Sequence, residues 1–273
     1  MKLRFVIVLP LAVLPLLLST GCVTPTGEQP NVLTTEEEIK LGATMSAEID
    51  KEESPLKINA IQVYVRKIGE RLADQSPRHD VPYSFTVIDN PDVVNAFALP
   101  GGHMYVYTGL MLMCDNEAQL ASVMAHEIAH VAAKHHGEAY TRQRMIDGVR
   151  ALILGPRNSA LAAGGSGILG QLFQLQFSRV QENEADYIGM DILFRAGYKP
   201  EAMVDFMQKL ASFEQEQGAR PQPRALQFFA SHPATTDRIA HLNALLQRYP
   251  VELRNLSPTY FERYKVNILD VLN

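Results

Sequence analysis

The sequence predicts a mainly helical fold that contains one small β-sheet. Several long segments place apolar residues at helical spacing, whereas three short stretches between residues 83 and 107 alternate as strands do. Stretches that contain glycine and proline separate these segments. The chain has 273 residues, of which 47% are hydrophobic, and this is enough to bury one substantial core. We therefore expect a single α+β domain over residues 34–273.

Residues 1–21 have the composition of an export signal. Lys2 and Arg4 make the N-terminus positively charged, and the apolar stretch that follows is shorter than a typical membrane-spanning helix. It ends in Leu-Ser-Thr-Gly-Cys, which resembles a bacterial lipobox. We expect Cys22 to carry a lipid anchor and residues 22–33, with two prolines and a glycine, to form a tether. The alternative is an ordinary secretory signal with a chance cysteine.

The charge balance and the two cysteines restrict the partners and the compartment. Loss of Lys2 and Arg4 with the signal would take the formal net charge from −5 to −7. No basic patch remains in the sequence, so nucleic acid is not an expected partner. Acylation of Cys22 would leave Cys114 without a disulfide partner, and its apolar neighbours predict burial. Val23, rather than an aspartate, follows the lipobox, which favours the periplasmic side of a bacterial outer membrane.

The first elements follow in order after the tether. A capped start with an acidic first turn predicts a helix over residues 34–52, and apolar spacing predicts a second helix over 56–75. Residues 83–88, 94–99 and 103–107 alternate as strands do. A Pro-Gly-Gly turn joins the last two of them. We expect a small sheet in this part of the chain.

The segment of residues 116–137 contains the motif that carries the chemistry. His126-Glu127-Ile128-Ala129-His130 matches H-E-x-x-H, and no glycine or proline interrupts residues 116–136, so a helix is expected. The two histidines lie one turn apart on one face and can reach one metal ion. Glu127 lies about 100° round the helix, where it can act as the general base on a water at the metal. The alternative is a helix with two unrelated histidines.

Two further histidines follow the motif. His136 lies six residues after His130, as in the longer metzincin pattern, but Ala133 occupies the position where that pattern has a chain-turning glycine. On an unbroken helix, His136 would point about 240° away from His130. We therefore interpret His135 and His136 as solvated residues at a helix end, where they suit the negative end of the helix dipole.

A zinc site requires a third protein ligand. Glu182 and Asp186, in the stretch of residues 178–189, are spaced i, i+4 on one helical face about 50 residues downstream. We expect Glu182 to complete a His-His-Glu site and Asp186 to accept the free N–H of a ligating histidine. Glu184 projects from a different face and is the less favoured ligand. The alternative is an acidic, solvated helix face.

Three segments in this order resemble one family of zinc metallopeptidases, which includes the CAAX prenyl endopeptidases, HtpX-type membrane proteases and soluble periplasmic lipoprotein peptidases. They are the segment Asn95–Leu110, the H-E-x-x-H helix and the E-x-E-A-D helix. Together with Ser231-His232-Pro233 they cover roughly residues 60–245. The chain lacks the multiple membrane spans of the first two groups, so it is similar to the soluble lipoprotein branch.

The resemblance implies a mainly helical gluzincin fold and the roles of several residues. It implies one Zn²⁺ per chain, held by His126, His130 and Glu182, with Glu127 as the base. His232 and Arg238 resemble family positions near the zinc, so we predict catalytic roles for both. Arg238 could stabilise the tetrahedral intermediate, and His232 could approach the open metal position or the oxyanion. The alternatives are a helix cap at His232 and a structural ion pair at Arg238.

The strand residues Asn95, Ala96, Phe97 and Ala98 are candidates for substrate binding. A metallopeptidase commonly holds an extended substrate by main-chain hydrogen bonds to an edge strand. We hypothesise that this segment, or its hairpin partner, offers that edge. The alternative is a purely structural hairpin.

The rest of the chain adds elements without an assigned chemistry. Residues 145–177 join the two site helices and contain a glycine-rich middle, which could form a lid, although an ordinary helical hairpin is favoured. Helices are expected over residues 200–217 and 235–248, and a final helix over 258–273.

Together these inferences predict a zinc-dependent endopeptidase of the bacterial cell envelope. The resemblance implies unfolded or damaged proteins as its substrates and partners. One alternative is an outer-membrane assembly or chaperone-like lipoprotein that uses the same cleft with little proteolysis. Another is an interaction lipoprotein whose zinc is only structural, and Glu127 argues against it because a structural site needs no general base.

Overall fold

The computed structural model describes most of the predicted domain. The described residues are 31–154, 177–217, 232, 236–256 and 259–272. Cys22, the predicted signal and most of the predicted tether lie outside them, as does the greater part of the segment that joins the two site helices. Among the helices of the described residues, none combines the length and the apolar composition that a membrane crossing requires.

Helix α1 spans Thr35–Glu52 and begins at the predicted cap. The hydroxyl of Thr34 accepts a hydrogen bond from the backbone N–H of Glu37, whose carboxylate accepts one from the backbone N–H of Thr34. Helix α2 spans Asn59–Ala73 and is slightly shorter at both ends than the sequence predicts. The apolar residues that predicted it are buried, namely Ile61, Val65, Ile68 and Leu72.

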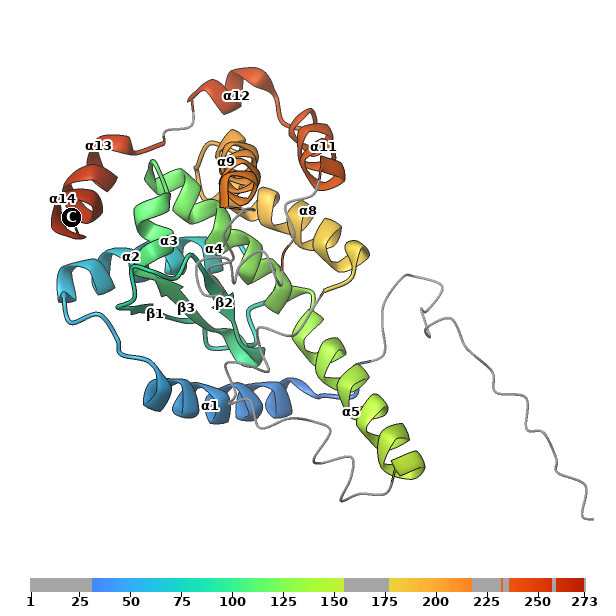
Figure 1. The fold of residues 1–273 in the computed structure, drawn as a ribbon. Coiled ribbons are helices and arrows are strands. Elements are labelled where there is room, and N and C mark those ends of the chain that lie inside the picture. The colour runs from blue at the N-terminus through green and yellow to red at the C-terminus, as the bar shows by residue number, and fades with distance from the viewer. Residues whose placement is uncertain (1–30, 155–176, 218–231, 233–235, 257–258, 273) are drawn as a thin grey trace, which may run out of the picture. The chain divides into compact units, whose positions relative to one another are not determined.

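In the described part of the chain, the sheet has three strands in the order β1-β3-β2 (Figure 1). Strand β1 spans Ser84–Ile88, β2 spans Ala96–Ala98 and β3 spans His103–Tyr107. Strands β2 and β3 form the predicted antiparallel hairpin, and β1 pairs with β3 in parallel. A short helical turn, Pro100–Gly102, joins the hairpin, and Gly101 has a φ of 78° that disfavours a side chain. Strand β2 therefore lies at an edge of this sheet.

The two faces of the sheet pack against different helices. Along β3, Met104 and Val106 belong to the larger core, to which α2 and the later helices contribute. Tyr105 and Tyr107 alternate with them and pack in a smaller cluster with Ile49 of α1. In Figure 1, α1 and α2 accordingly lie on opposite sides of the sheet. The alternation of the strand thus places apolar side chains in two separate clusters.

Helix α4, Glu117–Ala132, carries the H-E-x-x-H motif and is buried along almost its whole length. Its first residue, Glu117, is fully buried and accepts hydrogen bonds from the hydroxyls of Tyr64 and, at 2.8 Å, Tyr198. Arg263 completes this network through an ion pair with the same carboxylate. A buried carboxylate requires such partners. The C-terminal segment is therefore bound to the start of the motif helix.

The remaining helices follow along the chain and agree with most of the predicted segments. Their bounds are α3 Thr108–Met113, α5 His135–Leu154, α8 Arg179–Arg195, α9 Glu201–Gln217, α11 Thr236–Leu246, α12 Val251–Leu256, α13 Phe261–Tyr264 and α14 Asp270–Leu272, with a π-helical turn, Lys265–Leu269, before the last. The predicted final helix is thus divided into three short pieces. The fold is mainly helical with a small sheet, as the sequence predicts.

The predicted uninterrupted helix through His136 is wrong. Helix α4 ends at Ala132, and α5 begins at His135 after a turn. Lys134 adopts a left-handed conformation with a φ of 60°, and its carbonyl accepts a hydrogen bond from the N–H of Glu138. A left-handed conformation costs a residue other than glycine about 1–2 kcal/mol. Because lysine rarely adopts it, a lysine in the sequence does not predict a turn at this position.

Candidate metal centre

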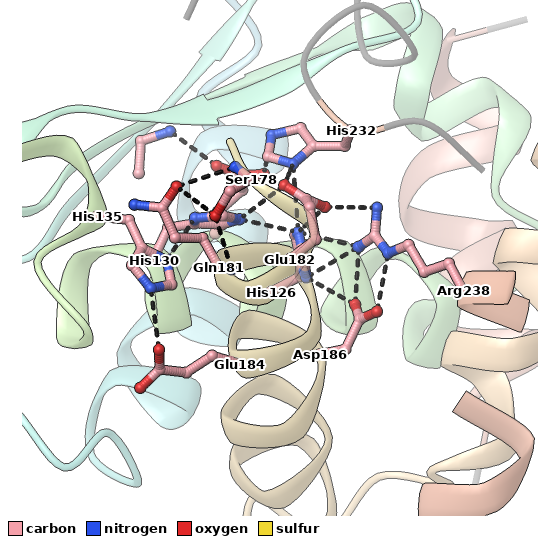
Figure 2. A network of polar contacts seen from close by, with 12 residues as sticks. His126, His130, His135, Ser178, Gln181, Glu182, Glu184, Asp186, His232 and Arg238 are labelled. Atoms are coloured by element: carbon pink, nitrogen blue, oxygen red, sulfur yellow. Dashed lines mark hydrogen bonds and ion pairs between the residues drawn. The ribbon is translucent and has the colours of Figure 1, made fainter. Parts of the chain in front are cut away.

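The candidate site forms where α4 packs against α8. His126 and His130 lie one turn apart on α4, and Glu182 reaches them from α8 (Figure 2). Gly189 allows the two helices to approach closely, because a Cβ there would lie 3.0 Å from the Cα of His126. The two motif-bearing helix faces therefore meet each other.

Donor atoms of four described side chains converge at this contact. The Nε2 atom of His126 lies 3.1 Å from Nε2 of His130 and 3.4 Å from Nδ1 of His232. The Oε1 atom of Glu182 lies 2.8 Å from Nδ1 of His232 and 3.5 Å from Nε2 of His130. All four side chains are buried, and each offers one ligand atom within 4.8 Å of the others.

The spacing of these donors fits one metal ion. Bonds of about 2.0–2.1 Å from a tetrahedral zinc ion place neighbouring donors about 3.3 Å apart. Five separations between these side chains, from 2.8 Å to 3.6 Å, bracket that value. Imidazole nitrogen and carboxylate oxygen are also donors that zinc commonly takes. The predicted set of His126, His130 and Glu182 can therefore hold a metal, with His232 in reach as a fourth donor.

Glu127 is buried beside this donor group. Its Oε2 atom accepts a hydrogen bond from the backbone N–H of Ala98 at 3.2 Å, and Oε1 lies 3.3 Å from Nε2 of His232. Burial raises the pKa of Glu127 above its ordinary value. A carboxylate with a raised pKa is better suited to accept a proton and then return it.

Asp186 lies behind His126, in the place that the i, i+4 spacing indicates. Its Oδ1 atom is 3.0 Å from Nδ1 of His126. Arg238 donates to both oxygens of Asp186, at 2.8 Å and 2.7 Å, and its Nη1 lies 2.7 Å from Oε2 of Glu182. Burial would raise the pKa of Asp186, but the charge of Arg238 lowers it to about 2. In this structure Arg238 thus holds the two carboxylates in place.

The prediction that His135 and His136 are solvated is wrong. His135 is 1% exposed and His136 is 6% exposed. Because the chain turns at Lys134, the Nδ1 atom of His135 lies 2.9 Å from Nδ1 of His130. Burial lowers the pKa of His135 to about 4. Sequence spacing could not reveal this contact, since residues five apart on a continuous helix point about 140° away from each other.

The candidate substrate strand lies next to the same site. The N–H of Ala98 in β2 donates a hydrogen bond to Glu127. Main-chain groups of Asn95 and Leu99 pair with β3, as in the 3.0 Å bond from the N–H of Tyr107 to the carbonyl of Asn95. Ala96 and Ala98 therefore direct their main-chain groups toward the outer edge of the sheet.

The family model described as Peptidase family M48 matches residues 59–246. The chain belongs to peptidase family M48. The matched range includes α4, α8 and all four converging donors. This M48 chain therefore carries a metallopeptidase domain, as the motifs predict. Helix α1 and the segment after α11 lie outside the matched range.

Several named proteins are similar in sequence to this chain. The Beta-barrel assembly-enhancing protease of Yersinia pestis is 36% identical over 186 residues, which are 65% of this chain and 37% of that protein. The protein of the same name in Escherichia coli (strain K12) is 33% identical over 210 residues, 73% of this chain and 42% of that protein. The Mitochondrial metalloendopeptidase OMA1 of Schizosaccharomyces pombe is 33% identical over 212 residues, 74% of this chain and 58% of that protein. The chain spans less than two thirds of the length of each of these relatives.

Proposed function

We propose that this M48 chain is a zinc-dependent endopeptidase. The observation that carries the proposal is the convergence of His126, His130 and Glu182, with the Glu127 carboxylate buried beside them. A zinc ion held by these three residues would supply a Lewis acid that acidifies water and polarises the peptide carbonyl. Two imidazoles and one carboxylate are a donor set found in zinc hydrolases.

Glu127 is the general base in this proposal. Its Oε2 is held by the Ala98 N–H at 3.2 Å, which fixes the direction of the carboxylate. Glu127 takes a proton from the attacking water and returns it to the leaving amine, and its raised pKa favours both transfers. Asp186 accepts the Nδ1–H of His126 and so directs the other ring nitrogen of that histidine toward the donor group.

The substrate would lie along the outer edge of β2. In this proposal the main-chain groups of Ala96 bind an extended peptide, while the N–H of Ala98 stays on Glu127 and Phe97 keeps the strand paired with β3. The side chain of Asn95 is buried, and its amide has no hydrogen-bond partner within the part of the chain that the structure describes. A peptide amide would satisfy it, which is a second reason to place substrate here.

The natural substrates in this proposal are unfolded or damaged proteins of the bacterial envelope. The names of the bacterial relatives associate them with β-barrel assembly and proteolysis, and this supports a location in the cell envelope. The lipobox-like sequence at Cys22 supports attachment to a membrane by a lipid, on the periplasmic side of the outer membrane. The net charge of −5 gives no reason to include nucleic acid among the partners.

The test is cleavage of an unfolded model protein by the purified chain loaded with zinc, beside the variant Glu127→Gln. We expect the variant to lose at least about 100-fold in kcat/KM, because general-base catalysis contributes about 10²–10⁴-fold. Its zinc content should stay unchanged, because Glu127 is not one of the converging donors. Glu70→Gln, which removes an exposed carboxylate of α2, is the control and should cleave as the original chain does. Equal cleavage by the chain and Glu127→Gln would refute the proposal.

The position of His232 favours a second possibility, an assembly or chaperone-like role with little proteolysis. With His232 the donor group offers four protein atoms, and a closed set of four is typical of zinc sites without catalysis. We propose instead that His232 restrains an active site and must withdraw for water to enter. Arg238 would then be a positioning residue that holds Glu182 and Asp186 while His232 moves, in place of the predicted contact with the tetrahedral intermediate.

The variant His232→Ala separates these two functions. Restraint by His232 predicts faster cleavage by His232→Ala, with zinc still bound by His126, His130 and Glu182. Loss of cleavage with zinc retained would instead make His232 a catalytic group toward the oxyanion. No cleavage by either protein under any condition, with zinc bound in both, would favour the assembly role over the peptidase.

A further inference from the structure

The ring nitrogen of His130 that faces away from the donor group has a specific partner. His130 directs Nε2 toward His126 and Glu182, whereas its Nδ1 lies 2.9 Å from Nδ1 of His135. At this distance one nitrogen carries the hydrogen and the other accepts it. If Nε2 is to offer a lone pair to a metal, the neutral ring of His130 must carry its hydrogen on Nδ1. His135 is then the acceptor.

The contact continues from His135 to the surface of α8. A His135 ring that accepts at Nδ1 carries its hydrogen on Nε2, and Nε2 lies 3.4 Å from Oε2 of Glu184. The side chain of Glu184 is 53% exposed, whereas His130 and His135 are almost completely buried. Figure 2 shows these three side chains one after another in space, with Glu184 farthest from the donor group. The chain of contacts therefore runs from the metal centre to solvent.

The turn at Lys134 makes this arrangement possible. Its left-handed conformation starts α5 in a new direction, so that His135 faces back toward the last turn of α4. Phe177 packs over the rings, with its centroid 4.1 Å from that of His130 and 6.2 Å from that of His135. Packing alone would place the rings together, but it would not align a nitrogen with a nitrogen and a second nitrogen with a carboxylate.

We propose that His135 and Glu184 are positioning residues that hold His130 in the tautomer and orientation needed to bind the metal. His135 accepts the Nδ1–H of His130, and Glu184 accepts the Nε2–H of His135. Outer partners of this kind fix the tautomer of a ligating histidine and increase its basicity. The inference rests on the proposed metal site but not on peptidase activity, because the property that it predicts is metal affinity.

The experiment measures zinc affinity by competition with a chelator, in the full chain and its variants. His135→Phe should bind zinc about 10–100-fold more weakly, the usual effect of losing such a partner. His135→Asn should recover part of that loss, because its amide oxygen can take the place of Nδ1 and accept from His130. Glu184→Gln should weaken binding by a smaller factor. Asp191→Asn removes another exposed carboxylate of α8 and should leave the affinity unchanged.

Two further readouts distinguish positioning from a structural role. The absorption spectrum of the cobalt-substituted protein should change in His135→Phe, while thermal unfolding of the metal-free protein reports any general loss of stability. Glu184→Gln should have no additional effect in the His135→Asn background, because asparagine cannot reach Glu184. The double variant of His135→Asn and Glu184→Gln can still test the proposal if His135→Phe fails to fold.

The proposal is overturned if His135→Phe binds zinc within twofold of the original chain with an unchanged cobalt spectrum. It is also overturned if His135→Asn binds no better than a folded His135→Phe, or if the effects of Glu184→Gln and His135→Asn simply add. These outcomes are distinct from failure of the peptidase proposal. A chain that binds zinc but cleaves nothing can still show the dependence on His135.

Discussion

The two histidines of the H-E-x-x-H motif lie 3.1 Å apart at their Nε2 atoms, yet different kinds of neighbours hold them. His126 contacts a buried carboxylate directly, and that carboxylate, Asp186, is paired with Arg238. His130 contacts another imidazole, His135. Burial and Arg238 would lower the pKa of His126, but hydrogen bonds to carboxylates raise it to about 9. Burial lowers the pKa of His130 well below its ordinary value.

This difference shows two ways to orient a ligand inside a protein. On the His126 side, orientation depends on a balance of buried charges, so the loss of one charge should destabilise the whole domain. On the His130 side, orientation depends on a short turn and on neutral rings, so substitutions there should change metal affinity more than stability. Three experiments test this contrast.

The largest effect is expected on the His126 side. The variant Asp186→Ala leaves the buried guanidinium of Arg238 with Glu182 but without the carboxylate that it contacts twice. Removal of one partner from a buried ion pair costs about 3–5 kcal/mol, and we expect the lower end of that range for the metal-free protein. Denaturant unfolding measures it. Asp191→Ala, which disrupts an exposed pair on the same helix, should cost less than about 1 kcal/mol. Similar losses in both variants would contradict the contrast.

A pH-dependent effect, smaller within any one pH unit, is expected beside His130. Burial and the neighbouring His135 lower the pKa of His136 to about 3, whereas the unfolded chain has its ordinary value of 6.5. Between those two values the unfolded state binds a proton that the folded state does not. The stability of the metal-free protein should therefore fall as pH falls through this window, by about 1.4 kcal/mol per pH unit from this group. Above about pH 7 this group should contribute no slope.

The comparison with His136→Phe tests that slope. The variant removes the group, so its stability should fall less steeply between pH 6.5 and pH 4, whatever its absolute stability. Denaturant unfolding at several pH values, with a chelator present, gives both curves. Parallel curves would mean that His136 is not held neutral in the folded protein.

The smallest effect is expected at the turn itself. Lys134 has a φ of 60°, which glycine adopts more easily, so Lys134→Gly should raise the free energy of unfolding by up to about 1 kcal/mol. Zinc affinity should not change. Lys67 lies exposed within α2, where glycine should instead destabilise the protein by about 1 kcal/mol. Thermal unfolding of the two variants should therefore shift in opposite directions, and a shared downward shift would show that the turn is not strained.

The parts of the site that regular helices determine could be predicted from the sequence. The pairs His126 and His130, and Glu182 and Asp186, are spaced four residues apart, and each pair shares one helical face. Asp186 lies 3.0 Å from the ring of His126, where the predicted acceptor of a histidine N–H should lie. The alternating segments likewise predicted the hairpin of the sheet. Wherever the backbone is regular, the spacing of residues in the sequence predicts which side chains share a face.

The parts that depend on a single irregular dihedral angle or on distant pairing could not be predicted. The contact of His135 with His130 requires the left-handed Lys134, and a lysine there looks like any helical residue. The parallel pairing of β1 with β3 joins segments that no local pattern relates. Arg238 meets Asp186 across 52 residues of chain, so its role as a partner of both carboxylates depends on the packing of α11 and α8.

The network at Glu117 bears on how much of the chain must be kept together. The family match ends at residue 246, yet Arg263 binds a fully buried carboxylate in the first turn of the motif helix. The carbonyl of Thr259 also accepts the N–H of Ala118 in that turn, and the hydroxyl of Tyr264 reaches the carbonyl of Met111. A fragment cut at the end of the family match would lose all three contacts, two with the first turn of α4 and one with α3. The stretch that matches the family model is therefore smaller than the unit that should be kept intact when the protein is expressed, truncated or fused.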